Sequence, residues 1–132
     1  EMLSATGGYR LAADEAGRKV VLIATGSEVE LAMNVRAALE EKGIGADVVS
    51  MVCTELFDEQ DVGYRADILP ADALKVSIEA GTTFGWERYT GTDGVNIGLD
   101  SFGASAPAEV LYPHFGFSVE AIVPKIVGKL KA

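Results

Sequence analysis

Along the chain, apolar runs typical of strands alternate with segments whose apolar and polar positions are typical of helices. Residues 20–24 are a continuous apolar run rich in β-branched side chains, a pattern typical of a strand covered on both faces, as in a parallel sheet. Further strands are predicted at residues 9–11, 46–51, 74–78 and 95–99. The segments between them carry helix signals, so the pattern predicts strands that alternate with helices.

The helix expected after the first apolar run has a signal at each end. Ser27 and Glu30 have the spacing of a capping box, in which two free backbone donors are satisfied. Gly43 suits the left-handed residue that closes a helix. The buried stripe of this helix is expected to consist of five apolar residues: Val29, Ala32, Met33, Ala37 and Leu39.

Three more helices are predicted downstream. One covers residues 57–69 and ends at Pro70, and a short one covers residues 107–112. Ser118 is expected to cap the last helix. Pro124 conflicts with an uninterrupted last helix, since proline would kink it or make it start late.

Strands alternating with helices predict an α/β domain with helices on both faces of the sheet. The sheet has about five strands and need not be wholly parallel, because the short segment at residues 9–11 can lie at an edge. The 132 residues are the size of one domain, so we expect a single domain over residues 1–132.

The charge balance narrows the possible partners. Twenty acidic residues against eleven basic ones give a net charge of −9, which opposes binding to nucleic acids and to anionic membranes. No apolar run approaches the length of roughly 20 residues that spans a bilayer, and the first residues lack the features of a secretory signal. Cys53 is the only cysteine, so no intrachain disulfide can form. We therefore expect a reducing, cytoplasmic setting.

The turn Thr25, Gly26 and Ser27 is the strongest local candidate for chemistry. It lies between an apolar strand and a helix, where free amides attract anions. Two interpretations stay open: a binding site for a small anion or a nucleotide, and a simple capped helix. The acidic residues Glu28 and Glu30 favour the second, because they already satisfy the helix dipole.

Two other places contain candidate functional groups. His114, the sole histidine, can act as a general base near neutral pH, but placement of a cation at a helix terminus or ordinary packing is the favoured interpretation. Glu79 follows a predicted strand at the edge where α/β proteins gather their sites, without a second titrating group tied to it by spacing. Phe84, Trp86 and Tyr89 are either core residues or, together with Glu79, part of an interface.

Several segments in order resemble the C-terminal domain of the transketolase family. They are GGY at 7–9, IATGSEV at 23–29, VVSM at 48–51, FDEQ at 57–60, YR at 64–65, VSIEAG at 76–81, TFGW at 83–86, FGASAP at 102–107 and FGF at 115–117. The resemblance covers nearly the whole chain. It implies a mixed, mostly parallel sheet with flanking helices in a three-layer α/β/α arrangement.

The resemblance also implies a function for the parent protein. Family enzymes of the pentose phosphate pathway are homodimers that transfer a two-carbon ketol unit between sugar phosphates, with thiamine diphosphate and magnesium or another divalent cation. Their catalytic, cofactor and metal residues lie in two preceding domains that are absent from this chain, so no such residue is assigned here. The leading hypothesis is a structural and assembly domain, and the alternative is a regulatory module that binds an anion at Thr25–Gly26–Ser27.

Overall fold

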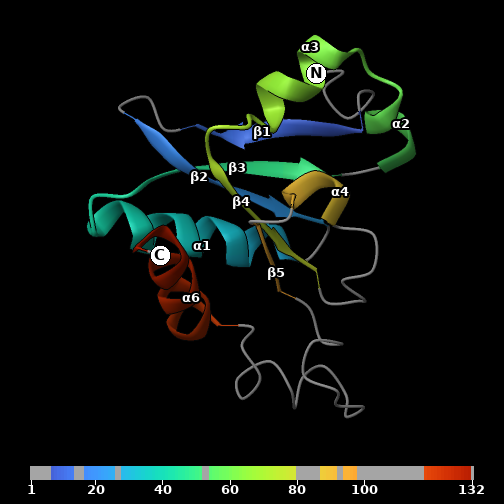
Figure 1. Ribbon diagram of the computed structural model, residues 1–132. Helices are drawn as coiled ribbons and strands as arrows, with labels where there is room; N and C mark the ends of the chain where they lie inside the picture. Colours follow the sequence, from blue (N-terminus) through green and yellow to red (C-terminus); the bar gives the residue numbers. More distant parts are fainter. Residues whose placement is uncertain are drawn as a thin grey trace.

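The computed structural model describes residues 7–13, 17–25, 28–51, 54–79, 87–91, 94–97 and 118–131. The described strands form one sheet in the order β1-β3-β2-β4-β5 (Figure 1). They are β1 (Gly8–Ala12), β2 (Arg18–Ala24), β3 (Gly45–Met51), β4 (Leu74–Ile78) and β5 (Val95–Ile97). Strand β1 runs antiparallel to β3 at one edge, and the other neighbouring pairs are parallel. The mixed, mostly parallel sheet and the edge position of residues 9–11 are thus confirmed.

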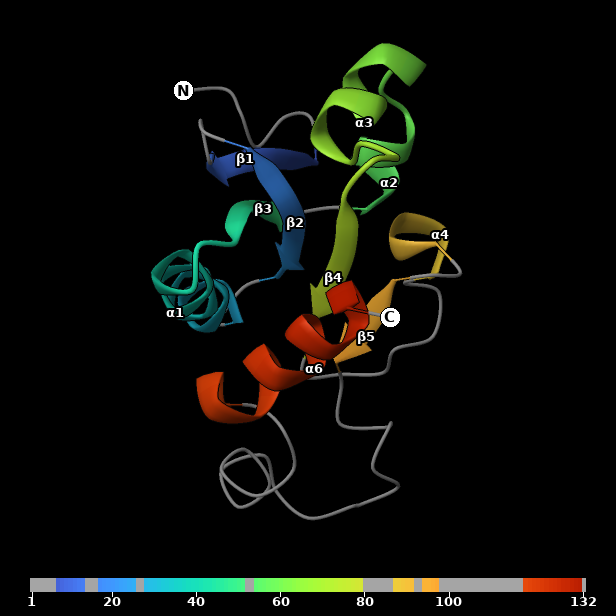
Figure 2. The ribbon, with the colours of Figure 1, turned by 60° about the vertical axis from the view of Figure 1, so that its left-hand side comes forward.

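Helices cover both faces of this sheet (Figures 1 and 2). One face carries α1 (Glu28–Glu41) and α6 (Val119–Lys131). The opposite face carries α2 (Thr54–Asp58), α3 (Val62–Ile68) and α4 (Glu87–Thr90). The structure therefore has the predicted three-layer α/β/α architecture.

Strand β2 lies at the centre of both hydrophobic cores. Its residues Val20 and Leu22 pack with α1 and α6, whereas Val21 and Ile23 pack with the helices of the other face. All four side chains are fully buried. This alternation explains why the segment reads as one continuous apolar run, because neither face meets water.

Helix α1 ends as the sequence predicts. Gly43 has a φ of +80°, a conformation that favours glycine. Its N–H donates to the carbonyl of Glu40 at 3.0 Å, and the Ile44 N–H donates to the carbonyl of Leu39 at 2.9 Å. These two bonds form a Schellman motif, which turns the chain from α1 into β3.

The buried stripe of α1 differs in part from the prediction. Ala32 and Leu39 are fully buried, but Ala37 is exposed. Val35, which was not assigned to the stripe, is fully buried. A spacing of three and four residues joins Ala32, Val35 and Leu39 on one face, and Ala37 lies off that face.

The predicted helix over residues 57–69 is wrong in its continuity. The chain forms α2 and α3 instead, with a break at residues 59–61. Asp61 is extended at φ −70° and ψ 166°, and its carboxylate accepts from the Tyr64 N–H at 2.8 Å. The break therefore starts a second, newly capped helix. The predicted end before Pro70 is confirmed.

The last helix begins at its predicted cap. The Ser118 hydroxyl accepts from the Ala121 N–H at 3.2 Å, and α6 starts at Val119. Pro124 lies inside α6, so it neither ends the helix nor delays its start. The predicted helix at residues 107–112 lies outside the described residues, as do the last two residues of the strand predicted at 95–99.

Candidate functional site

The carboxyl ends of β2 and β4 meet at the point where the strand order reverses. From β2 the chain passes through α1 to β3 on one side, whereas β4 pairs with β2 on the other side. Open α/β sheets place ligands at such a switch point. Thr25 follows β2 and Glu79 follows β4, so two residues that the sequence singled out separately lie at this edge.

The structure joins these two residues directly. The Thr25 hydroxyl donates a hydrogen bond to the Glu79 carboxylate across 54 positions of sequence. The Glu79 N–H donates to the carbonyl of Ile97 at 3.0 Å. Glu79 is thus held by residues on both sides of β4, and its carboxylate lies at the turn where an anion was considered.

A second carboxylate occupies the same end of α1. Glu28 is the first residue of the helix, its side chain is 6% exposed, and its N–H donates to the Thr25 carbonyl at 2.9 Å. Negative charge at a helix N-terminus is stabilising, but two carboxylates there repel an incoming anion. Gly26 and Ser27 lie outside the described residues. The anion site at Thr25–Gly26–Ser27 stays a prediction, and the neighbouring carboxylates weigh against it.

The proposed interface residues fall into different places. Tyr89 is 7% exposed, its ring centroid lies 6.0 Å from that of Phe57, and its hydroxyl donates to Asp58 at 3.0 Å. The core interpretation therefore holds for Tyr89 within this chain. Phe84 and Trp86 lie outside the described residues, so their role in an interface stays a prediction. His114 and Cys53 also lie outside them.

A buried polar cluster joins β4, β5 and α4. The hydroxyls of Ser77 and Thr90 both donate to the side-chain oxygen of Asn96, at 2.7 and 3.0 Å. Ser77 and Thr90 are 1% and 3% exposed. Since buried hydroxyls cost stability unless they are bonded, this cluster fixes the position of α4 on the sheet.

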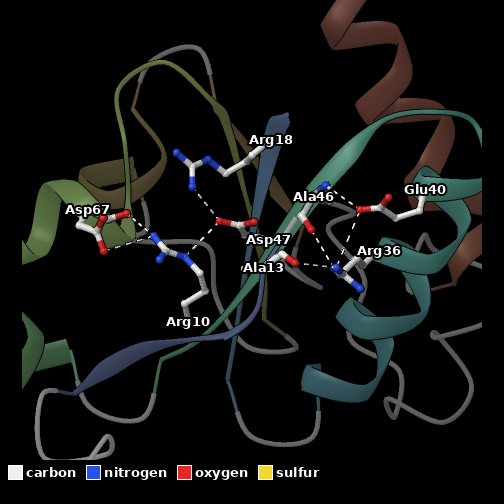
Figure 3. Close-up of polar contacts among 8 residues, drawn as sticks. All are labelled: Arg10, Ala13, Arg18, Arg36, Glu40, Ala46, Asp47 and Asp67. Atoms are coloured by element: carbon white, nitrogen blue, oxygen red, sulfur yellow. Dashed lines mark hydrogen bonds and ion pairs between the residues drawn. The ribbon is translucent and has the colours of Figure 1, made fainter. Parts of the chain in front are cut away.

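A buried ion cluster that was not predicted joins the other three strands (Figure 3). Asp47 of β3 is fully buried, and Arg10 of β1 and Arg18 of β2 approach its carboxylate at 3.1 and 2.9 Å. Arg10 also lies 3.5 Å from the exposed carboxylate of Asp67 in α3. A single acidic residue inside an apolar strand was the sequence signal for this cluster. The ion pairs link β1, β2 and β3, although the Nε atoms of Arg10 and Arg18 are buried without a hydrogen-bond partner among the described residues.

Two possible site classes find no support in the described residues. No three or more His, Cys, Asp or Glu side chains gather there in a way that could hold a metal ion. None of the helices in the described part of the chain combines the length and apolar character needed to cross a bilayer.

Comparisons with known proteins identify a family. The profile described as "Transketolase-like TK C-terminal domain" matches residues 7–118. The chain is 51% identical over 120 residues to transketolase-1 of Arabidopsis thaliana, covering 89% of this chain and 16% of that protein. It is 54% identical over 114 residues to the chromosomal transketolase of Cupriavidus necator, covering 86% of this chain and 17% of that protein. The transketolase structure from Leishmania mexicana matches with a TM-score of 0.83 at 42% identity, and the match covers 96% of this chain and 18% of that one.

Proposed function

The chain belongs to the transketolase family, in which it corresponds to the C-terminal domain, and on this premise we propose that it is a non-catalytic assembly domain. Its parent enzyme would transfer a two-carbon ketol unit between sugar phosphates with thiamine diphosphate and a divalent cation. The homodimeric state, the pentose phosphate pathway and the cytoplasmic setting belong to the same proposal.

The extent of the family match carries this proposal. The chain spans 16% and 17% of the lengths of the Arabidopsis and Cupriavidus enzymes, so most of such an enzyme lies in other domains. We assign the divalent cation and the cofactor to those domains. At the sheet edge, the hydroxyl of Thr25 is engaged by Glu79, which supports a structural role for this pair.

A domain exchange tests the assembly role. The C-terminal domain of the Cupriavidus enzyme is deleted in one variant and replaced by this chain in another. We expect the deletion to lower both activity and the dimer fraction measured by light scattering, and the replacement to restore both. A deletion variant that remains fully dimeric and active would show that the domain has no assembly role.

A further inference from the structure

A hollow of about 530 Å³ opens on the face of the sheet that carries α2, α3 and α4. Its apolar wall comes from Phe57, Val62, Leu69 and Tyr89. This volume is within the range of sites that hold small molecules, which combine apolar walls with a few polar groups. A smaller hollow of about 230 Å³ adjoins it and shares Lys75 in its lining.

Arg65 of α3 provides one cation in the lining. Its Nε donates to the carbonyl of Gln60 at 3.0 Å, which orients the guanidinium group. The two terminal nitrogens have no partner among the described residues. A guanidinium group held in this way can present a two-pronged donor to a carboxylate or a phosphate.

Lys75, at the start of β4, provides the second cation. Its ammonium group donates to the carbonyls of Pro70 and Ala73, at 2.8 and 3.2 Å, and a third N–H remains because an ammonium has three. Burial lowers the pKa of Lys75 and the Asp72 carboxylate opposes that shift. A bound anion would compensate for the water that the ammonium has lost.

The charge of the lining is opposite in sign to that of the whole chain. Among the described lining residues, Arg65 and Lys75 are accompanied by one carboxylate, that of Asp58, which accepts a hydrogen bond from the Tyr89 hydroxyl at 3.0 Å. The chain as a whole carries a net charge of −9. Within the described lining two cations therefore stand beside one carboxylate and an apolar wall, and the Asp72 carboxylate, which is not among these lining residues, also acts on Lys75.

We propose that this hollow binds a small organic anion, a carboxylate or phosphate on an apolar or ring-shaped body. Arg65 and Lys75 hold the anionic group, and the apolar wall packs against the body. This site is separate from the Thr25–Glu79 edge and does not depend on the proposed assembly role.

Titration with phenyl phosphate, followed by the amide signals of the ¹⁵N-labelled chain, tests the site. We expect saturable shifts at Ala66, Leu69 and Gly91, which line the hollow. Inorganic phosphate, which lacks the apolar body, and benzyl alcohol, which lacks the charge, should each bind at least tenfold more weakly. The same titration on the domain-exchange enzyme should give a similar affinity.

Three variants and one control assign the contacts. Arg65→Gln and Lys75→Met should each weaken the binding of phenyl phosphate about tenfold, since each removes a charge-assisted hydrogen bond. Ala66→Phe places a ring in the hollow from an exposed helix position and should abolish binding without disturbing the core. Lys129→Met removes an exposed cation from α6 on the other face and should leave the affinity unchanged.

Four results would overturn the proposal. The first is the absence of saturation at millimolar phenyl phosphate, and the second is a set of shifts centred on Thr25 and α1. The third is equal affinity for benzyl alcohol. The fourth is binding to the isolated chain but not to the domain-exchange enzyme, which would mean that another domain covers the hollow.

Discussion

Replacing Asp47 by asparagine tests whether the buried ion cluster holds three strands together. The substitution keeps the size of the side chain and removes its charge. Asp47 is fully buried, and it interacts with Arg18 at 2.9 Å and with Arg10 at 3.1 Å. Removing one member of a buried ion pair costs roughly 3–5 kcal/mol when the other charge is left without water.

The expected loss is smaller here because both arginines reach water. The side chains of Arg10 and Arg18 are 24% and 26% exposed, so they can be partly rehydrated, and an asparagine oxygen can still accept one hydrogen bond. We expect a loss of about 2–3 kcal/mol in the free energy of unfolding. With an m-value of about 1–3 kcal/mol per molar urea, the midpoint should fall by about 0.7–3 M.

Urea unfolding of the 132-residue chain, followed by circular dichroism, measures this change. Asp67→Asn is the matched control, because its carboxylate is 67% exposed and lies 3.5 Å from Arg10. Such an exposed pair should contribute less than about 1 kcal/mol. Equal midpoints for Asp47→Asn and the unchanged chain would refute the reasoning, since the buried carboxylate would then contribute nothing to stability.

Three further predictions concern single residues. Gly43→Ala should lower the free energy of unfolding by about 1 kcal/mol, because the φ of +80° is strained for alanine. Gly128→Ala, with open space around its Cβ in α6, should raise the free energy of unfolding by a similar amount. Thermal melts in which both substitutions move the midpoint in the same direction would contradict this pair of predictions. Thr25→Val should cost about 1–2 kcal/mol in urea unfolding by removing the hydrogen bond to Glu79, and an unchanged midpoint would exclude a structural role for that bond. Burial lowers the pKa of Lys75 in the folded chain, so the unfolded chain binds more protons between that lowered pKa and the usual value near 10.5, and the contribution of this group to the free energy of unfolding rises with pH there. Lys75→Met should remove that rise, and parallel profiles of unfolding free energy against alkaline pH for the two proteins would contradict the prediction.

Strands and helix ends could be predicted from the sequence because their signals are local. The apolar run of β2 follows from burial on both faces, and the caps at Gly43 and Ser118 depend on residues only a few positions away. The break between α2 and α3 was missed because Asp61 lies inside a segment with continuous helical spacing. Helix α4 has only four residues, too few to show a period.

The arrangement of the site depends on strand order, which the sequence pattern does not contain. Thr25 and Glu79 were each identified from their positions after strands, but their hydrogen bond requires β2 and β4 to be neighbours. The cluster around Asp47 likewise requires β3 to lie between the strands of Arg10 and Arg18. Residues far apart in sequence meet through the sheet, so their chemistry becomes visible only in three dimensions.

The central claim is that this chain supports a transketolase without carrying its reaction. The most direct measurement is the turnover of a ketose-phosphate donor by the isolated 132-residue chain, with thiamine diphosphate and magnesium, beside the domain-exchange enzyme. We predict turnover by the domain-exchange enzyme and none by the isolated chain. Turnover by the isolated chain would contradict the claim and would place the active site within these 132 residues.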